Sequence, residues 1–274
     1  LCRQRRRRDE LLVQLLSMAD PQGPEPIRLA KRVAAQLSCS RSDAENFIAG
    51  GWVRVNGHVQ ESPQSRVEER DVVEVDPKAR LEALAPVTVL WHKPAGVAMP
   101  EGGLVPPAWA AQHLGASTRW SGDRSGVRLL KAHAQQLQVG AGLAVRASGL
   151  VVLSQNPGVV RKLSDASDAV EHEWLAELAQ APALQDPDRR EAVLQSLGKV
   201  VFVDGTSVPK ARASWQSEWR VRLAIKGYLD GQVAHLAERA GLSLTGLRRL
   251  RVGRLSLTPL PEGQWRFLLL HERF

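Results

Sequence analysis

Residues 27–76, IRLAKRVAAQLSCSRSDAENFIAGGWVRVNGHVQESPQSRVEERDVVEVD, hold the densest set of secondary-structure signals in the chain. Apolar side chains recur at helical spacing in the first part, which predicts two helices between residues 27 and 48. Ser40 is the expected N-cap of the second helix, and Asp43 adds negative charge to its first turn. The side chains expected to face inward are Ile27, Leu29, Val33 and Leu37 in the first helix and Ala44, Phe47 and Ile48 in the second.

The second part of this stretch predicts a small sheet. Gly50-Gly51 ends the second helix. The alternating run WVRVNGHV, residues 52–59, carries Asn56-Gly57, a strong signal for a tight turn between two strands. A third short strand is expected at Val72, Val73 and Val75, before Asp76-Pro77. Residues 27–76 are therefore predicted to form a small α+β domain.

The composition of the 274 residues narrows the choice of partner. Lys and Arg number 37 against 29 Asp and Glu, which gives a formal net charge of +8. This balance favours a polyanionic partner, most commonly nucleic acid, although a merely basic soluble protein would show the same excess. No apolar run approaches the roughly 18–20 residues of a membrane-spanning helix, so no membrane association is predicted.

Cysteine and histidine usage argues against a metal centre. Cys2 and Cys39 are too few for a disulfide framework or a zinc cluster, and the seven histidines show no metal-ligand spacing. We therefore expect a reducing compartment, no metal and no small-molecule cofactor.

The motifs of residues 27–76 occur in the order found in a known RNA-binding module. The Arg-Leu-x-Lys start, the Ser-Arg-x-x-Ala-x-x-x-Ile helix, the Gly-x-Val-x-Val-Asn-Gly hairpin and the Asp-x-Val-x-Val strand resemble the alpha-L module of ribosomal protein S-four and of many RNA-modifying enzymes. The resemblance implies a basic helical face that grips RNA phosphates. The alternative is a solvated basic face. The implied RNA-binding residues here are Arg28, Lys31, Ser40, Arg41, Arg54 and Asn56.

The sequence after a predicted linker, residues 77–86, resembles a catalytic domain. A strand at 87–91 leads into the turn Lys93-Pro94-Ala95-Gly96, and this pattern is similar to the opening of pseudouridine synthases of the RsuA type. The resemblance implies a larger α+β domain over residues 87–274, with a mainly antiparallel mixed sheet and flanking helices. Further stretches that match the family in order are residues 148–163, 171–178 and 198–211, followed by Leu247, Arg249, Gly253, Gly263, Trp265 and Arg266.

The catalytic carboxylate implied by the resemblance is missing. Family enzymes break the bond between uracil and ribose and rejoin the base through carbon, with an Asp as nucleophile or base. In residues 139–150, VGAGLAVRASGL, alignment on Ser148-Gly149-Leu150 puts Ala144 at the Asp position. Alignment on the preceding Val-Gly puts Leu143 there. Asp123, in a weakly similar Asp-Arg-Ser-Gly run, is either a displaced carboxylate or an ordinary loop residue.

Three further departures lie at positions that the family uses. Trp174 replaces a Tyr beside the base, so it can stack but lacks the hydroxyl. The Gln-Val-Arg-Arg segment reads QVAH at 232–235 and loses two cations, and the Thr-Asn-Asp-Gly turn reads SQNPG at 154–158. Of the arginines in residues 247–251, one is expected to pair with a buried acid. The remaining RNA-contact candidates are Lys93, Arg248, Arg249 and Arg251.

Residues 1–26 form a basic N-terminal extension with five arginines between residues 3 and 8. It is interpreted as part of an organellar targeting segment, a phosphate-binding arm or a solvated tail. Because the first residue is Leu1 rather than Met, we expect the chain to begin inside a longer gene product. A mitochondrial location is the expectation, with chloroplast or cytoplasm as alternatives.

The hypothesis from the sequence is a catalytically inactive pseudouridine-synthase-like pseudoenzyme that binds ribosomal RNA. It would act in ribosome biogenesis or as a ribosome component, with ribosomal proteins or assembly factors as further partners. The alternatives are an active synthase that uses a displaced carboxylate and a protein-interaction module that no longer binds RNA.

Overall fold

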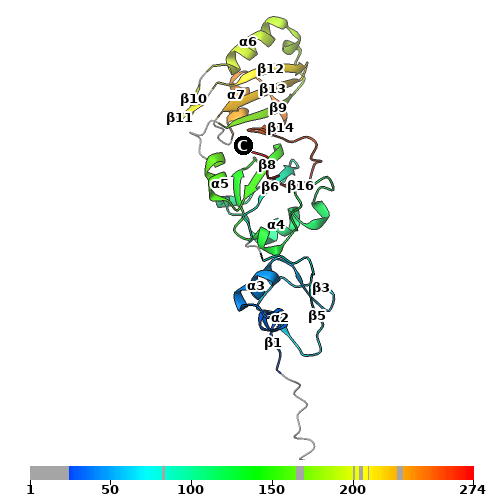
Figure 1. The fold of residues 1–274 in the computed structure, drawn as a ribbon. Helices are drawn as coiled ribbons and strands as arrows, with labels where there is room; N and C mark the ends of the chain where they lie inside the picture. The colour runs from blue at the N-terminus through cyan, green and yellow to red at the C-terminus, as the bar shows by residue number, and fades with distance from the viewer. Residues whose placement is uncertain are drawn as a thin grey trace, which may run out of the picture. The chain divides into compact units, whose positions relative to one another are not determined.

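The computed structural model divides the chain into two compact units, Leu1–Leu84 and Ala85–Phe274 (Figure 1). The division falls within the predicted linker, residues 77–86. The structure describes residues 25–81, 84–164, 170–199, 201–203, 206–208, 210–226 and 231–274. The basic run near the N-terminus lies outside these residues.

The N-terminal unit packs two helices against short strands. Its elements are β1 (Ile27–Arg28), α2 (Leu29–Leu37), α3 (Arg41–Ala49), β2 (Val53–Val55), β3 (His58–Val59), β4 (Arg66–Val67) and β5 (Val73–Val75). One sheet has the order β3-β2-β5, and β1 pairs with β4 in a second. The core consists of Leu29, Ala30, Val33, Ala44, Ile48, Val53 and Val67.

Local signals in this unit are confirmed. The Ser40 hydroxyl accepts a hydrogen bond from the Asp43 amide at 3.1 Å and caps α3. Asn56 and Gly57 have φ angles of 51° and 80°, as the tight turn requires. The predicted apolar stripe of the first helix was wrong at its end, because Leu37 is 38% exposed. The helix stops there, and Ser38 turns the chain away with a φ of 51°.

The C-terminal unit is built on one nine-stranded sheet of order β12-β13-β9-β14-β8-β6-β16, with β7 added on β8 and β15 on β14. The pairing of β14 with β8 is parallel and the others are antiparallel, so the predicted mainly antiparallel mixed sheet is confirmed. The strands are β6 (Thr88–Lys93), β7 (Gln138–Ala141), β8 (Ser148–Ser154), β9 (Glu171–Leu178), β12 (Arg212–Ser217), β13 (Arg220–Lys226), β14 (Leu244–Val252), β15 (Leu255–Ser256) and β16 (Trp265–Phe267).

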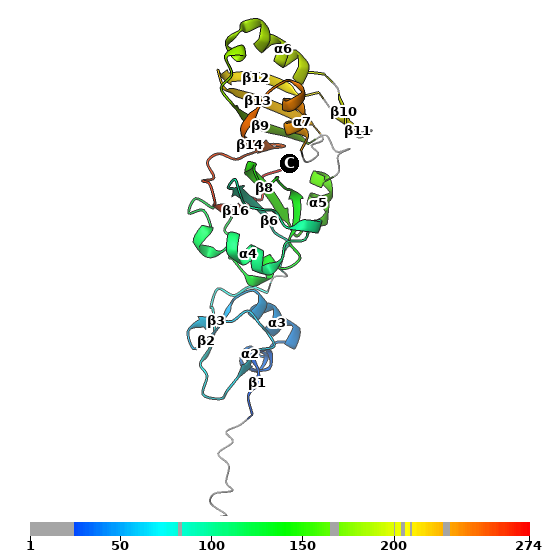
Figure 2. The same ribbon diagram turned by 180° about the vertical axis from the view of Figure 1, so that it is seen from behind.

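Helices flank this sheet. α6 packs on β12 and α7 on β14, whereas α5 packs on β7 and β8 (Figure 2). The helices are α4 (Pro107–His113), α5 (Pro157–Ser164), α6 (Pro187–Leu197) and α7 (Gln232–Arg239). Short 3-10 turns lie at η1 (Glu101–Gly103), η2 (Ala116–Thr118), η3 (Lys131–Ala134) and η4 (Pro182–Gln185), and a separate hairpin pairs β10 (Val201–Val203) with β11 (Thr206–Val208).

Side chains from the two faces of the sheet enter two different apolar clusters. Along β6, Val89 and Trp91 belong to the larger cluster, while Leu90 between them belongs to the smaller one. Successive residues of a strand point to opposite faces, so the two clusters lie on opposite sides of the sheet. The larger cluster also holds Trp174, Trp265 and Phe267.

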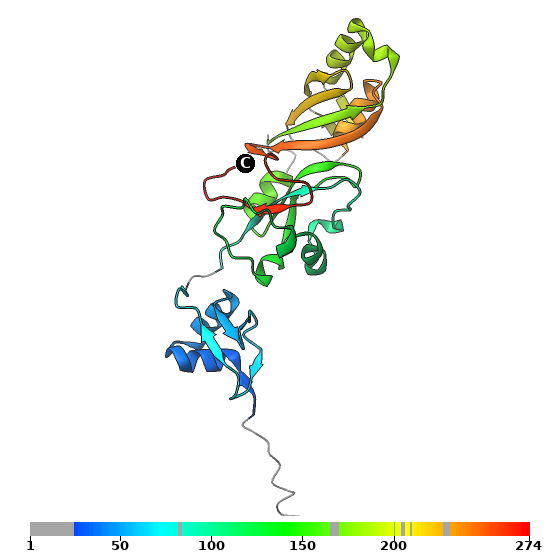
Figure 3. The ribbon, with the colours of Figure 1, turned by 90° about the vertical axis from the view of Figure 1, so that its right-hand side faces the viewer.

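Gly149 permits the parallel junction at the centre of the sheet. It pairs with Arg249 of β14, which lies along β9 (Figure 3). Gly149 has a φ of 113°, and a Cβ atom there would lie 2.5 Å from the Arg249 amide nitrogen. The backbone conformation and the close approach both require glycine. This is a physical reason for glycine in the Ser-Gly-Leu motif at 148–150.

Candidate functional site

The loop where a catalytic Asp was sought joins β7 to β8, and Ala144 lies in it. Ala144 is exposed between two buried ends, Leu143 and Ala147, each 4% exposed. A methyl group neither attacks carbon nor exchanges a proton. Residues 142–147 therefore present no group for general acid–base or nucleophilic chemistry.

Lys93 holds this loop from beneath. Its side chain is fully buried, and its Nζ donates to the carbonyl oxygens of Pro94 at 3.0 Å, Val145 at 3.1 Å and Ala147 at 2.7 Å. Burial lowers the pKa of Lys93 to about 8. The predicted contact of Lys93 with RNA is corrected, because all three ammonium protons are directed at backbone oxygens inside the protein.

Arg249 and Trp174 form a second buried contact. Arg249 is fully buried, and it donates from Nε to the Leu150 carbonyl at 2.7 Å and from Nη2 to the Ala141 carbonyl at 2.6 Å. Its guanidinium carbon lies 5.3 Å from the Trp174 ring centroid, and Trp174 is also fully buried. The predicted RNA contact of Arg249 is corrected, because its guanidinium hydrogen-bonds the backbones of two neighbouring strands. The predicted base stacking of Trp174 is corrected as well, because its ring faces the larger apolar cluster.

Arg251 confirms the expectation that one arginine in this strand pairs with a buried acid. It contacts Glu171 at 2.5 Å and Glu173 at 3.0 Å, and Glu173 is 6% exposed. Burial pushes the pKa of Glu173 upward, but hydrogen bonds from Arg222 and Arg251 outweigh it and keep that pKa below its usual value. The predicted RNA contact of Arg251 is corrected to this internal ion pair. Arg248 is exposed and stays a predicted RNA contact.

Asp123 is not placed to act as a displaced catalytic carboxylate. Its side chain is 2% exposed and lies 2.7 Å from Arg119. It also accepts hydrogen bonds from the amides of Ser125 at 2.9 Å and Phe267 at 3.3 Å. Burial raises the pKa of Asp123, but the hydrogen bonds from Ser125 and Arg119 lower that pKa by more than burial raises it. The carboxylate therefore stays ionised. It organises its own loop, as the ordinary reading of this residue predicted.

The N-terminal unit carries exposed cations on its helices and strands. Arg28, Lys31, Arg41 and Arg54 are exposed, and they stay predicted RNA contacts. Arg28 donates to Gln64 at 2.5 Å, and Arg41 pairs with Glu45 at 3.1 Å. The exposed Arg66 escaped sequence reasoning. It lies opposite Arg28 in the β1–β4 pair, and that pairing joins residues far apart in the chain.

The side chains of two polar residues in this unit form hydrogen bonds within the protein. The Asn56 amide group donates to Asp71 at 2.9 Å and accepts from the Val72 amide at 2.9 Å, so its predicted RNA contact is corrected to a brace of the hairpin. The Ser40 hydroxyl is engaged in the cap of α3. Its contribution to RNA binding is therefore indirect: it caps α3, and the free backbone amides at the start of that helix are the groups that could bind a phosphate.

Metal sites and membrane-spanning helices are absent from the described part of the chain. It contains no group of three or more His, Cys, Asp or Glu residues that could hold a metal ion. None of its helices combines the length and the apolar character needed to cross a membrane.

Comparisons with known proteins agree with both units. Residues 27–73 match the S4 domain family. The dual-specificity RNA pseudouridine synthase RluF of Salmonella typhi is 26% identical, over 88% of this chain and 75% of its own length. An uncharacterized RNA pseudouridine synthase of Aquifex aeolicus is 26% identical, over 90% of this chain and 94% of its own length.

A crystal structure of a pseudouridylate synthase shares the fold, with a TM-score of 0.50, 20% identity, and coverage of 88% of this chain and 96% of the other. The S4 match covers the unit with exposed cations, and the relatives extend across the nine-stranded sheet. The chain thus joins an S4 domain to a pseudouridine-synthase fold, and the comparisons support its likeness to pseudouridine synthases of the RsuA type.

Proposed function

We propose that this protein binds ribosomal RNA and no longer converts uridine to pseudouridine. The observation that carries the proposal is Ala144, an exposed methyl group in the loop where the family's carboxylate is expected. Asp123, the displaced candidate, is buried against Arg119. Trp174, which replaces the expected base-stacking residue, lies within the core. Binding and chemistry are thereby separated, since the cations of the S4 domain do not depend on this loop.

RNA binding would rest on paired cations in the S4 domain. Arg28 and Arg66 are cross-strand neighbours, and Lys31 lies three residues after Arg28, in the first turn of α2. Like charges placed directly opposite each other repel, and a phosphate between them would relieve that repulsion. Such contacts follow the shape and charge of folded RNA rather than a base sequence. A role in ribosome assembly, with assembly factors or ribosomal proteins as partners, extends the same proposal.

An isomerisation assay tests the missing chemistry. Ribosomal RNA transcripts of both subunits are incubated with the full chain, and pseudouridine is detected by carbodiimide-dependent primer-extension stops and by nucleoside mass spectrometry. We expect none, whereas an active relative on the same transcripts provides the positive control. Pseudouridine formed by this protein would refute the proposal, and its loss in Asp123→Asn would then identify a displaced carboxylate.

A salt titration tests the binding. Each phosphate contact should contribute about 0.7–0.9 to the slope of log affinity against log salt. Charge reversal at Lys31 and Arg41 together should weaken binding and flatten this slope by about 1.5. Arg239→Glu, an exposed arginine of the other unit, is the matched control. A flat salt response of the wild type would instead support the protein-interaction alternative.

A further inference from the structure

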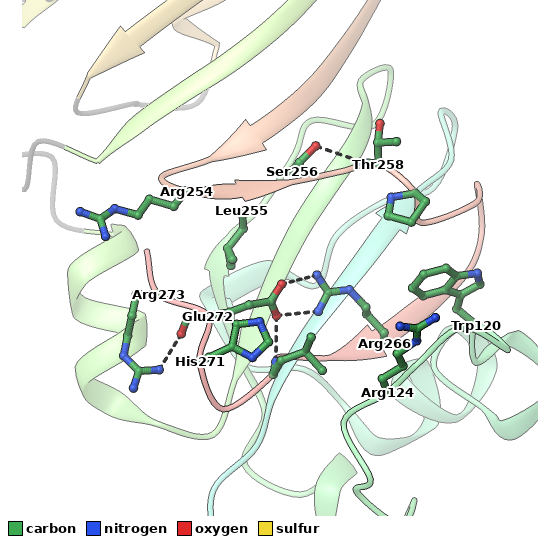
Figure 4. A pocket seen from close by; sticks show the side chains of 13 residues that line it. Trp120, Arg124, Arg254, Leu255, Ser256, Thr258, Arg266, His271, Glu272 and Arg273 are labelled. Carbon is green, nitrogen blue, oxygen red and sulfur yellow. Dashed lines mark hydrogen bonds and ion pairs between the residues drawn. The ribbon is translucent and has the colours of Figure 1, made fainter.

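The C-terminal unit contains a pocket that has no role in the proposed function described above. It has a volume of about 750 Å³ and lies between residues 120–124 and the chain from residue 254 to residue 273 (Figure 4). This volume lies within the range of pockets that hold a nucleotide-sized ligand. The residues that define its chemistry are Trp120, Arg124, Arg254, Arg266, His271 and Arg273.

The pocket carries a strong positive charge. Glu272 is the acid among its described lining residues, and Arg266 binds both carboxylate oxygens at 2.7 Å. Arg124 and Arg254 have no ion-pair partner among the described residues, and both are exposed. Arg273 donates to the backbone carbonyls of residues 270 and 272. Because a carbonyl carries no formal charge, these hydrogen bonds do not neutralise the guanidinium. The pocket is therefore suited to an anion that carries more than one phosphate.

Trp120 gives the pocket an aromatic wall. It is half-buried, and it packs against the smaller apolar cluster. A Cβ atom at Gly122 would clash with the Trp120 ring, so the absence of a side chain at residue 122 allows the indole its position. In Figure 4 the Trp120 ring and Arg124 lie on one side of the pocket, with Arg254 and Arg273 on the other. An aromatic ring combined with arginines is the arrangement that binds the bases and phosphates of single-stranded nucleic acid.

The pocket lies on the opposite face of the sheet from Trp174. Along β16, Trp265 and Phe267 enter the larger apolar cluster with Trp174, so Arg266 between them points to the other side. Leu255, another lining residue, belongs to the smaller cluster on that side. The pocket thus lies on the face opposite Trp174, and no residue of the Ala144 loop (142–147) lines it.

We infer that this pocket binds single-stranded RNA, with its arginines on successive phosphates and Trp120 stacked on a base. The inference goes beyond the S4 domain, because it places a second RNA contact on the other unit. The positive charge argues against a basic partner, and the combination of Trp120 with several separated arginines favours a strand over a lone phosphate. A free nucleotide shares part of this chemistry, and the experiment separates the two.

The test measures binding of a fluorescent eight-nucleotide RNA to the full chain at about 0.1 M salt. Arg254→Glu should weaken binding at least about fivefold, whereas Arg239→Glu, also exposed, should change it less than about twofold. Trp120→Leu should weaken binding by about fivefold or more through lost stacking. Thermal unfolding of each variant checks that the fold is kept, and Arg254 has no ion pair with any residue that the structure describes.

Crosslinking with 4-thiouridine in the same RNA locates the contact. We expect crosslinked peptides that contain Trp120 or residues 254–273. Crosslinks confined to residues 25–81, or equal affinities for Arg254→Glu and Arg239→Glu, would overturn this inference and leave the S4 proposal standing. Uridine monophosphate that competes as well as the oligonucleotide would also overturn it. No RNA binding by the wild type would refute both proposals.

Discussion

Replacement of Lys93 by Met should alter how the stability of the protein depends on pH. Met has a similar length but no ammonium, so it removes the buried charge beneath the Ala144 loop. In the folded protein the pKa of Lys93 is lowered to about 8, whereas the unfolded chain has the ordinary value of 10.5. Between these values the unfolded chain holds a proton that the folded protein has released. The unfolding free energy of the wild type must therefore rise with pH across this window.

The size of this rise follows from the pKa difference. One pKa unit corresponds to about 1.4 kcal/mol, so the wild type should gain about 3 kcal/mol relative to Lys93→Met between about pH 7 and pH 10.5. The carbonyl oxygens of Pro94, Val145 and Ala147 favour the ammonium form and oppose the shift. About 3 kcal/mol is accordingly the upper limit.

Urea denaturation of both proteins over this pH range provides the measurement. The other lysines titrate in both proteins, so the difference between the two curves isolates Lys93. Lys31→Met, at an exposed lysine, is the matched control and should follow the wild type. Parallel curves for the wild type and Lys93→Met would refute the reasoning, because they would mean that the Lys93 ammonium is as well solvated in the folded protein as in the unfolded chain.

Three further substitutions test other parts of the sheet. Gly149→Ala should cost about 3 kcal/mol or more in urea denaturation, because backbone strain adds to the clash with Arg249; a cost under about 1 kcal/mol would contradict the close approach. Burial, Arg249 and Arg251 lower the pKa of His172 to about 3. The unfolding free energy should therefore be about 2.5 kcal/mol lower at about pH 4.5 than above about pH 6.5, because the unfolded chain binds a proton at His172 that the folded protein does not. His172→Asn should remove this difference. Glu173→Gln should lower the unfolding free energy by about 2–3 kcal/mol by breaking nearly buried ion pairs, and an unchanged melting temperature would contradict this.

The two helices and the hairpin of the N-terminal unit could be predicted from its sequence because their signals are local, whereas the β1–β4 pair, which includes Ile27, was missed. Ser40 caps the helix that begins at Arg41 by accepting from the amide three residues on, and Asn56-Gly57 turns the chain within a hairpin. The contact between Arg28 and Arg66 was beyond prediction, since it depends on a strand pair formed by residues 38 positions apart. Local chemistry thus defines the elements of this unit, while tertiary pairing determines which cations become neighbours.

In the C-terminal unit the sequence located the strands but not the orientation of their charged side chains. Lys93 and Arg249 were candidates for RNA contact because the family resemblance implies that they are positive groups near where the family binds RNA. The structure buries both, with their protons directed at backbone carbonyls. Likewise, the wall and the arginines of the basic pocket come from segments more than 130 residues apart, Trp120 and Arg254. No periodicity in the sequence connects them.

The arrangement of the buried cations explains how this fold tolerates Ala144. At one end of the loop the Lys93 ammonium donates hydrogen bonds to the backbone carbonyls of Val145 and Ala147. At the other end Arg249 binds the backbone carbonyl of Ala141. None of these bonds uses the side chain of residue 144, so a methyl group there leaves the scaffold intact. The exposed cations of the S4 domain and of the basic pocket are equally independent of this position. A residue without a carboxylate at position 144 is therefore compatible with this fold and with the surfaces that we propose bind RNA, which is what the proposed function requires.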